Sequence, residues 1–213
     1  MVYLVLEFLV IPSLLSLLSA ILPRPLTETG LNVVFFVINF CSILAIFHRF
    51  LWQSLLQTKN RIWHCLRYAF LGFLSYELIS YLLTLGIVFL HPGFANVNDQ
   101  AIAGMAQENF FLLSLCTVLL VPVTEECLFR GIFFVGFQKC GRFAAYAVSS
   151  LFFAFIHVVG YVGSFDILTL LLCCLQYLPA GLCLCWAYEK SDSIFAPILM
   201  HMTINQLGIF SMR

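Results

Sequence analysis

Residues 109–137 read NFFLLSLCTVLLVPVTEECLFRGIFFVGF, an apolar run interrupted by Glu125, Glu126 and Arg130. About 20 consecutive apolar residues are enough for a helix to cross the hydrocarbon core of a bilayer. Ionisable side chains inside such a span are costly, so they tend to face the interior of a helix bundle and to mark functional sites. This stretch therefore predicts a transmembrane helix that carries a polar site.

The composition of the whole chain agrees with a membrane environment. Of the 213 residues, 62% are hydrophobic and 9% are charged, whereas soluble domains carry about 25% charged residues. The apolar runs are continuous and do not alternate with period two, so they predict helices and not a β-barrel. Ten basic and ten acidic residues cancel, which excludes the basic field typical of nucleic-acid binding.

Breaks at Pro, Gly, Asn and charged residues divide the chain into about seven apolar segments. The predicted spans are 2–22, 30–52, 66–90, 109–137, 143–160, 167–188 and 194–211. The first lacks the positively charged region of a signal peptide, so we expect it to be retained. The predicted fold class is all-α: a polytopic transmembrane helix bundle of about seven spans, forming a single transmembrane domain over residues 1–213.

Basic residues indicate how the bundle is oriented. The connections 53–65, 138–142 and the one after the sixth span lie on one side. The other side has few basic residues near its connections and the chain termini. The first group is Lys59, Arg61, Lys139, Arg142 and Lys190, and the second is Arg24 and Arg213. The positive-inside bias places the first side in the cytoplasm and both termini outside. We expect the polar connection 91–108 to be partly helical at the membrane surface.

The adjacent carboxylates of the central span have different predicted environments. Arg130 lies four residues after Glu126, so the two share a helix face and should form an ion pair. Glu125 is rotated from Glu126 by about 100°, which leaves it free to address another neighbour. Such a separation of environments is typical of paired carboxylates with distinct acid and base roles. The alternative is a charge-neutralised polar clamp between helices.

Two later spans carry polar groups at helical spacing. His157 follows Phe153 by four residues, and Asn205 follows His201 by four, so each pair shares a helix face. Counting residues from the turn at 138–142 places Glu125 and His157 at similar depths, roughly 20 Å from that turn. We therefore expect the polar faces of three helices to meet in one layer.

These residues resemble the CAAX-protease and bacteriocin-processing family, also called the Abi family of intramembrane endopeptidases. Its signature is EExxxR in one helix, FxxxH in the next and HxxxN near the C-terminus. The chain has EECLFR at 125–130, FAFIH at 153–157 and HMTIN at 201–205. Three motifs in order on consecutive apolar spans are a specific match, and the resemblance covers roughly residues 109–207.

The resemblance implies an intramembrane endopeptidase that cleaves a peptide bond with activated water. Glu125 would be the general base and His157 its partner in activating water, with His201 and Asn205 as oxyanion donors. The supporting residues would be Glu126, Arg130 and Phe153. The expected partners are a peptide or membrane-protein substrate and the lipid bilayer. We expect a multi-pass protein of a bacterial cytoplasmic membrane.

Other functions fit some of the same residues. Two His and two Glu could hold zinc, but HExxH is absent and the histidines lie on separate helices, so we expect no metal. A non-catalytic membrane scaffold or a bacteriocin-immunity protein could keep the motif residues without turnover. A proton-coupled transporter could use Glu and His as relays, but such proteins commonly show two related halves, which this sequence lacks.

Overall fold

The computed structural model describes residues 6–22 and 26–212. Helices account for nearly all of these residues, and no β-strand occurs among them apart from an isolated bridge between Val162 and Phe165. The all-α fold class is therefore confirmed. Residues 2–5 of the predicted first span lie outside the described residues, as do Arg24 and Arg213 of the topology prediction.

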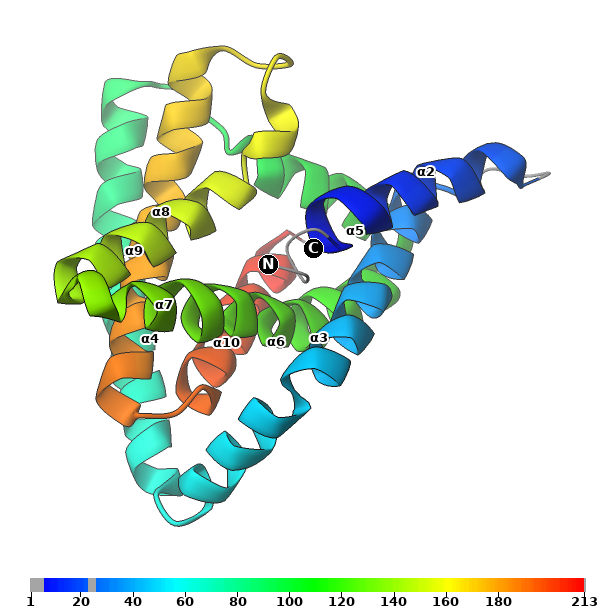
Figure 1. The fold of residues 1–213 in the computed structure, drawn as a ribbon. Coiled ribbons are helices and arrows are strands. Elements are labelled where there is room, and N and C mark those ends of the chain that lie inside the picture. The colour runs from blue at the N-terminus through cyan, green and yellow to red at the C-terminus, as the bar shows by residue number, and fades with distance from the viewer. Residues whose placement is uncertain (1–5, 23–25, 213) are drawn as a thin grey trace.

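Seven helical segments follow one another through the described residues, corresponding in order to the seven predicted spans (Figure 1). A π-helical turn Leu6–Val10 leads into α2 (Ile11–Ile21), followed by α3 (Glu28–Lys59) and α4 (Ile62–Leu90). The fourth segment is Val97–Cys140. It contains α5 (Val97–Leu115), a π-helical stretch Cys116–Leu120, α6 (Val121–Glu126), a π-helical stretch Cys127–Phe134, α7 (Val135–Phe137) and a 3₁₀ turn Gln138–Cys140. The last three are α8 (Arg142–Ile156), α9 (Ile167–Ser191) and α10 (Phe195–Ser211).

Four of the segments are long and apolar enough to cross a membrane: α3, α4, Val97–Cys140 and α9. The other helices, α2, α8 and α10, have 11, 15 and 17 residues. With 1.5 Å of rise per residue, these three are shorter than the roughly 30 Å hydrocarbon core. The chain is an integral membrane protein whose helices differ widely in length.

Two predicted connections are more helical than the sequence indicated. The prediction of a loop over 53–65 is wrong, because only Asn60 and Arg61 separate α3 from α4. In the connection 91–108, helix α5 already begins at Val97, where the Asn96 side chain accepts hydrogen bonds from the N–H groups of Asn98 and Asp99. The expected partial helix in 91–108 is therefore confirmed. Asn109, the predicted start of the fourth span, is a kink with non-helical φ and ψ inside α5.

The three connections predicted to share one side do lie together. Thr58, at the end of α3, has its hydroxyl 2.6 Å from that of Ser193, which precedes α10. Arg142 at the start of α8 donates to Glu189 near the end of α9 at 2.6 Å. These contacts join the ends of three hairpins, and the assignment of that side to the cytoplasm stays a prediction.

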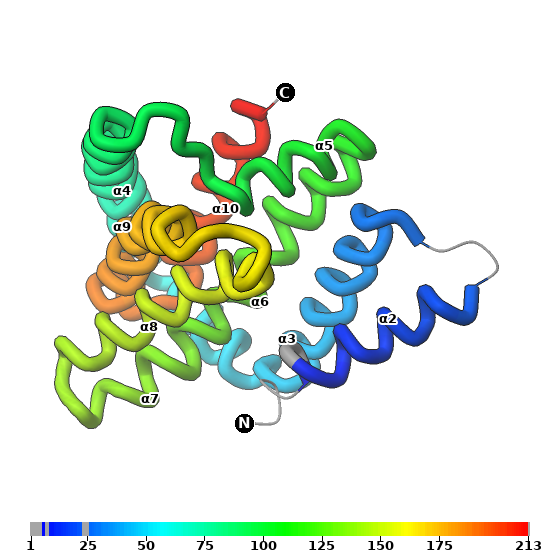
Figure 2. The backbone as a smooth tube through the Cα atoms, turned by 90° about the horizontal axis from the view of Figure 1, so that it is seen from above, coloured from blue at the N-terminus to red at the C-terminus, as the bar shows by residue number. Residues whose placement is uncertain are grey.

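Helix α9 is central to the packing, because it lies against α4, α8 and α10. The opposite edge is formed by α2, which lies beside α3 and away from α9 (Figure 2). Two helix backbones approach closely at Gly181 of α9, where a Cβ would lie 2.9 Å from both Cα and Cβ of Ser150 on α8. Glycine is therefore required there by the approach of two backbones.

We predict that Gly181→Ala lowers stability by about 1–3 kcal/mol, the usual cost of overpacking a close contact. The measurement is thermal unfolding of the purified protein in detergent. Gly86→Ala is the matched control, because Gly86 is also helical but has no atom within 4 Å of its would-be Cβ. Equal unfolding temperatures for the two variants would contradict the assigned close contact.

Candidate active site

The segment Val97–Cys140, called the central helix below, is distorted on both sides of the pair Glu125 and Glu126. Helix α6 has only six residues and lies between the π-helical stretches Cys116–Leu120 and Cys127–Phe134. Such π-helical turns are rare and frequently occur at functional sites. The distortion changes which side chains share a face, so ideal helical spacing places this region only approximately.

Pro122 explains one contact of the C-terminal helix. In the π-helical register, the N–H of Val121 donates to the carbonyl of Cys116, five residues earlier. Pro122 has no N–H, so the Thr117 carbonyl lacks the donor that this register would give it. Asn205 of α10 supplies one, since its Nδ2 donates to that carbonyl at 2.8 Å. The missing backbone donor thus helps to dock α10 on the central helix.

The predicted ion pair between Glu126 and Arg130 is present and fully buried. Arg130 Nη1 lies 2.8 Å from Glu126 Oε1, and both side chains are 0% exposed. Arg130 Nη2 donates to the backbone carbonyl of Gly181 at 2.9 Å, and the guanidinium lies 5.0 Å from the ring centroid of Phe153. This arrangement ties the central helix to α9 and α8. It also gives Phe153 a physical supporting role, as a face for a buried cation.

His201 makes a contact that the sequence did not predict. Its Nδ1 lies 2.8 Å from Glu126 Oε1, the same oxygen that accepts from Arg130. A carboxylate that accepts from Nδ1 fixes the ring plane and turns Nε2 to the other side. Glu126 therefore orients a histidine as well as neutralising Arg130.

His157 is fixed differently. It caps the end of α8, and its Nδ1 donates to the backbone carbonyl of Phe153 at 2.7 Å. Because a carbonyl can only accept, Nδ1 carries the proton, and Nε2 is left to face the site. The FxxxH spacing is thus explained by a hydrogen bond within one helical turn.

Glu125 brings the two histidines together. Its Oε2 lies 3.9 Å from Nε2 of His157 and 3.9 Å from Nε2 of His201. These distances are too long for direct hydrogen bonds, and Oε2 is buried without a hydrogen-bond partner among the described residues. The gaps suit a small molecule such as water between a carboxylate and two imidazoles. The predicted convergence of Glu125, His157 and His201 is therefore present.

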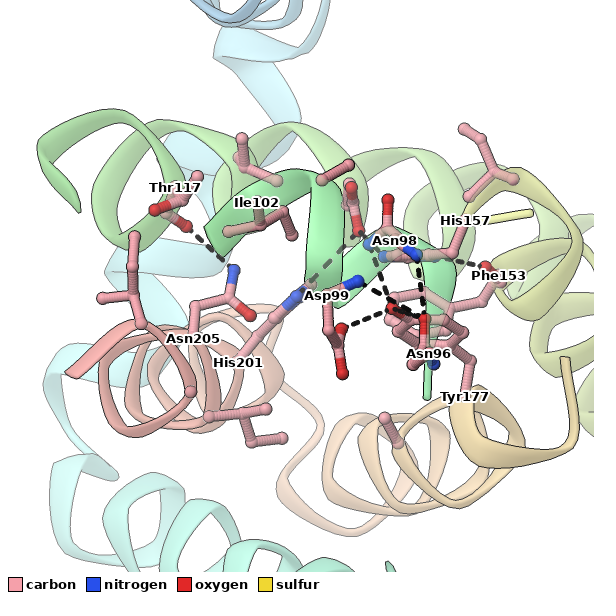
Figure 3. A pocket seen from close by; sticks show the side chains of 18 of the residues that line it. Asn96, Asn98, Asp99, Ile102, Thr117, Phe153, His157, Tyr177, His201 and Asn205 are labelled. Carbon is pink, nitrogen blue, oxygen red and sulfur yellow. Dashed lines mark hydrogen bonds and ion pairs between the residues drawn. The ribbon is translucent and has the colours of Figure 1, made fainter. Parts of the chain in front are cut away.

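Asn205 belongs to the same cavity but not to this triangle. It lines the cavity together with Glu125, His157 and His201. One of its amide hydrogens is engaged by the Thr117 carbonyl (Figure 3). The second amide hydrogen remains for another acceptor.

The cavity has a volume of about 1170 Å³. It receives side chains from the central helix, including α5, and from α2, α3, α4, α8, α9 and α10. Its polar wall includes residues that sequence reasoning missed. They are Gln176 together with Asn96, Asn98, Asp99 and Tyr177 (Figure 3). A signal was available for part of this wall, because Gln176 is an amide inside an apolar span, where polar groups are uncommon.

The described residues contain no group of three or more His, Cys, Asp or Glu arranged to hold a metal ion. The two histidines share Glu125 as a neighbour, but each also has its Nδ1 committed to another acceptor. The expectation of a metal-free site stays a prediction.

Comparison with known proteins bears on residues 107–207. This range matches the family model described as "Rce1-like: Type II CAAX prenyl endopeptidase Rce1-like". No match was found among curated proteins or among solved structures. The matched range contains all three motifs and ends just after Asn205. Residues 107–207 of this chain are therefore similar to the Rce1-like type II CAAX prenyl endopeptidases, in agreement with the resemblance indicated by the three motifs.

Proposed function

We propose that the protein is an intramembrane endopeptidase that hydrolyses a peptide bond of a membrane-associated or lipidated peptide or protein. The observation that carries the proposal is the carboxylate oxygen of Glu125, buried without a hydrogen-bond partner among the described residues and flanked by two imidazole nitrogens at 3.9 Å. A water molecule held between these groups would be polarised by an imidazole and would lose a proton to Glu125. Peptide hydrolysis needs this combination of base and donors.

In the first step, Glu125 accepts a proton from the water while the water oxygen attacks the carbonyl carbon of the substrate. His157 assists through Nε2, whose position is fixed by the bond between Nδ1 and the Phe153 carbonyl. The new C–O bond converts the carbonyl oxygen to an oxyanion. When the C–N bond breaks, Glu125 returns the proton to the departing amine, so the enzyme is regenerated.

The oxyanion is stabilised by His201 and by the second amide hydrogen of Asn205. The Glu126 carboxylate accepts from His201 Nδ1 and so fixes the ring with Nε2 3.9 Å from Glu125 Oε2. Arg130 shares Glu126 and keeps that carboxylate in place. Glu126 therefore supports the donor of the oxyanion site in addition to its structural pairing.

The substrate reaches the site from the lipid bilayer, which is the medium of the apolar helices around it. We propose a multi-pass location in a bacterial cytoplasmic membrane.

A membrane scaffold or bacteriocin-immunity protein would use the same cavity to hold a peptide without cleaving it, and a proton-coupled transporter would carry protons through it. Cleavage by the wild-type protein, and its loss in Glu125→Gln and Asn205→Ala, separates these functions from proteolysis.

Replacing Glu125 by Gln should lower kcat by a factor of at least about 100, because the amide keeps the shape of the side chain but cannot accept a proton. The assay is cleavage of membrane proteins by the purified enzyme in liposomes, followed by mass spectrometry. Glu189→Gln serves as a control for loss of a carboxylate far from the cavity. Turnover by Glu125→Gln within about tenfold of the wild type would remove Glu125 from the role of base.

Zinc removal should leave activity unchanged, since the proposed water activation depends on Glu125 and His157 alone. Purified enzyme is dialysed against a zinc chelator, assayed, and analysed for metal. Activity that disappears on dialysis and returns with added zinc would make the histidines ligands. That result would replace the mechanism while keeping the protein a peptidase.

Asn205→Ala should lower kcat by a factor of about 100 or more with little change in KM, as expected for loss of an oxyanion donor. The variant also loses the hydrogen bond to the Thr117 carbonyl, so kcat is measured on the folded, monodisperse fraction and unfolding temperature is recorded separately. His201→Ala should lose at least as much activity. If Asn205→Ala were less stable but kept an undiminished kcat, Asn205 would dock α10 on the central helix and would not stabilise the oxyanion.

A further inference from the structure

We propose that Tyr177 is a positioning residue for His157, and that the start of α5 holds Tyr177 in place. The proposal rests on the proposed function only in taking His157 as part of the reaction. It concerns an interaction between α9, α8 and α5 that the three sequence motifs do not include.

The first observation is the stacking of two rings. The rings of His157 and Tyr177 have centroids 4.3 Å apart and planes inclined by 24°. Phe153 provides a second, tilted aromatic neighbour at 4.7 Å. The imidazole is therefore confined by aromatic surfaces, and stacking of this kind fixes the plane of a ring as well as its position.

The second observation is the anchoring of the Tyr177 hydroxyl. It donates to Asp99 Oδ1 at 2.9 Å and accepts from Asn98 Nδ2 at 2.9 Å. The neighbouring Gln176 accepts from Asn96 Nδ2 at 2.9 Å. Figure 3 shows Asn96, Asn98 and Asp99 gathered near Tyr177 and His157. A phenol with both hydrogen-bonding roles filled by one short helical segment has little freedom to rotate.

His157 needs such support because of where it lies. It follows the last residue of α8 as its C-terminal cap, and the chain leaves the α-helix there. The bond from Nδ1 to the Phe153 carbonyl fixes one atom of the ring, but the ring also faces a large cavity. Tyr177 covers one face of the ring and so limits the direction in which Nε2 points. Small errors in the position of a reacting group can cost about 100-fold in rate.

The anchor also connects two parts of the chain. Asn96, Asn98 and Asp99 precede the family-matched range 107–207, whereas Tyr177 and His157 lie inside it. The start of α5 therefore takes part in arranging the site, although it contributes no motif residue. This assigns a role in the reaction to a segment of the N-terminal half.

The test compares variants that remove the anchor or the ring. Tyr177→Phe keeps the stack but loses the hydroxyl, and kcat should fall roughly five- to tenfold, in line with the loss of its hydrogen bonds to Asp99 and from Asn98. Tyr177→Leu removes the stack, and kcat should fall by a factor of about ten to a hundred with little change in KM. Asp99→Ala removes one of these two bonds, so its loss of kcat should not exceed that of Tyr177→Phe. The double variant should be no worse than Tyr177→Phe alone, because the bond that Asp99→Ala removes is already absent there.

A second readout does not depend on turnover. The rate at which diethylpyrocarbonate modifies His157, followed by peptide mass spectrometry, should rise several-fold in Tyr177→Leu, because one face of the imidazole is uncovered, and change less in Tyr177→Phe. Tyr146→Phe is the matched control, since the Tyr146 hydroxyl also donates to a carboxylate, Glu189, at 2.8 Å but lies outside the cavity.

The outcomes are distinguishable. If the wild type cuts no peptide, the proposed function fails, but a changed modification rate of His157 still supports the positioning role. Unchanged kcat and unchanged labelling in Tyr177→Leu would overturn the proposal. If Tyr177→Leu does not fold, Tyr177→Phe and Asp99→Ala decide it. Additive losses in their double variant, or equal losses in Tyr146→Phe, would then count against it.

Discussion

The buried pair of Glu126 and Arg130 is the interaction on which the rest of the site depends. One carboxylate oxygen accepts from Arg130 and from His201, and Arg130 continues to the backbone of α9. Three helices are therefore positioned by one charged group. Buried ion pairs commonly add little net stability, because desolvation offsets the attraction. Here Glu126 Oε2 and Arg130 Nε have no hydrogen-bond partner among the described residues, so specificity of helix arrangement is a better account of the pair than stability.

The sequence was informative wherever chemistry is local. Apolar run length predicted the helical segments, and the i, i+4 spacing predicted the bond between Glu126 and Arg130. Counting residues from a tight turn was enough to predict that Glu125 faces His157. Each of these inferences uses distance along one helix or one hairpin, which sequence position determines directly.

What the sequence could not predict depends on contacts between distant segments. The bond from His201 to Glu126 joins residues on two helices, and the network around Tyr177 joins α5 to α9. Polar residues in 53–65 also led to the prediction of a long connection between α3 and α4, whereas α3 continues through Lys59. The π-helical stretches were missed for another reason, since their effect is a shift of hydrogen-bond register without a distinctive residue pattern.

The spacing of Glu126 and Arg130 has a consequence for how the protein is made. The two side chains come from adjacent turns of one helix, so they can neutralise each other as soon as that helix enters the lipid, before α8, α9 or α10 has been synthesised. His201 and Asn205 arrive only with the last helix. Biogenesis can therefore insert the costly charges early as a neutral unit, while the complete constellation around Glu125 forms only when translation has delivered α10. A nascent chain that stops short of α10 would carry the carboxylates but lack the groups proposed to stabilise the oxyanion.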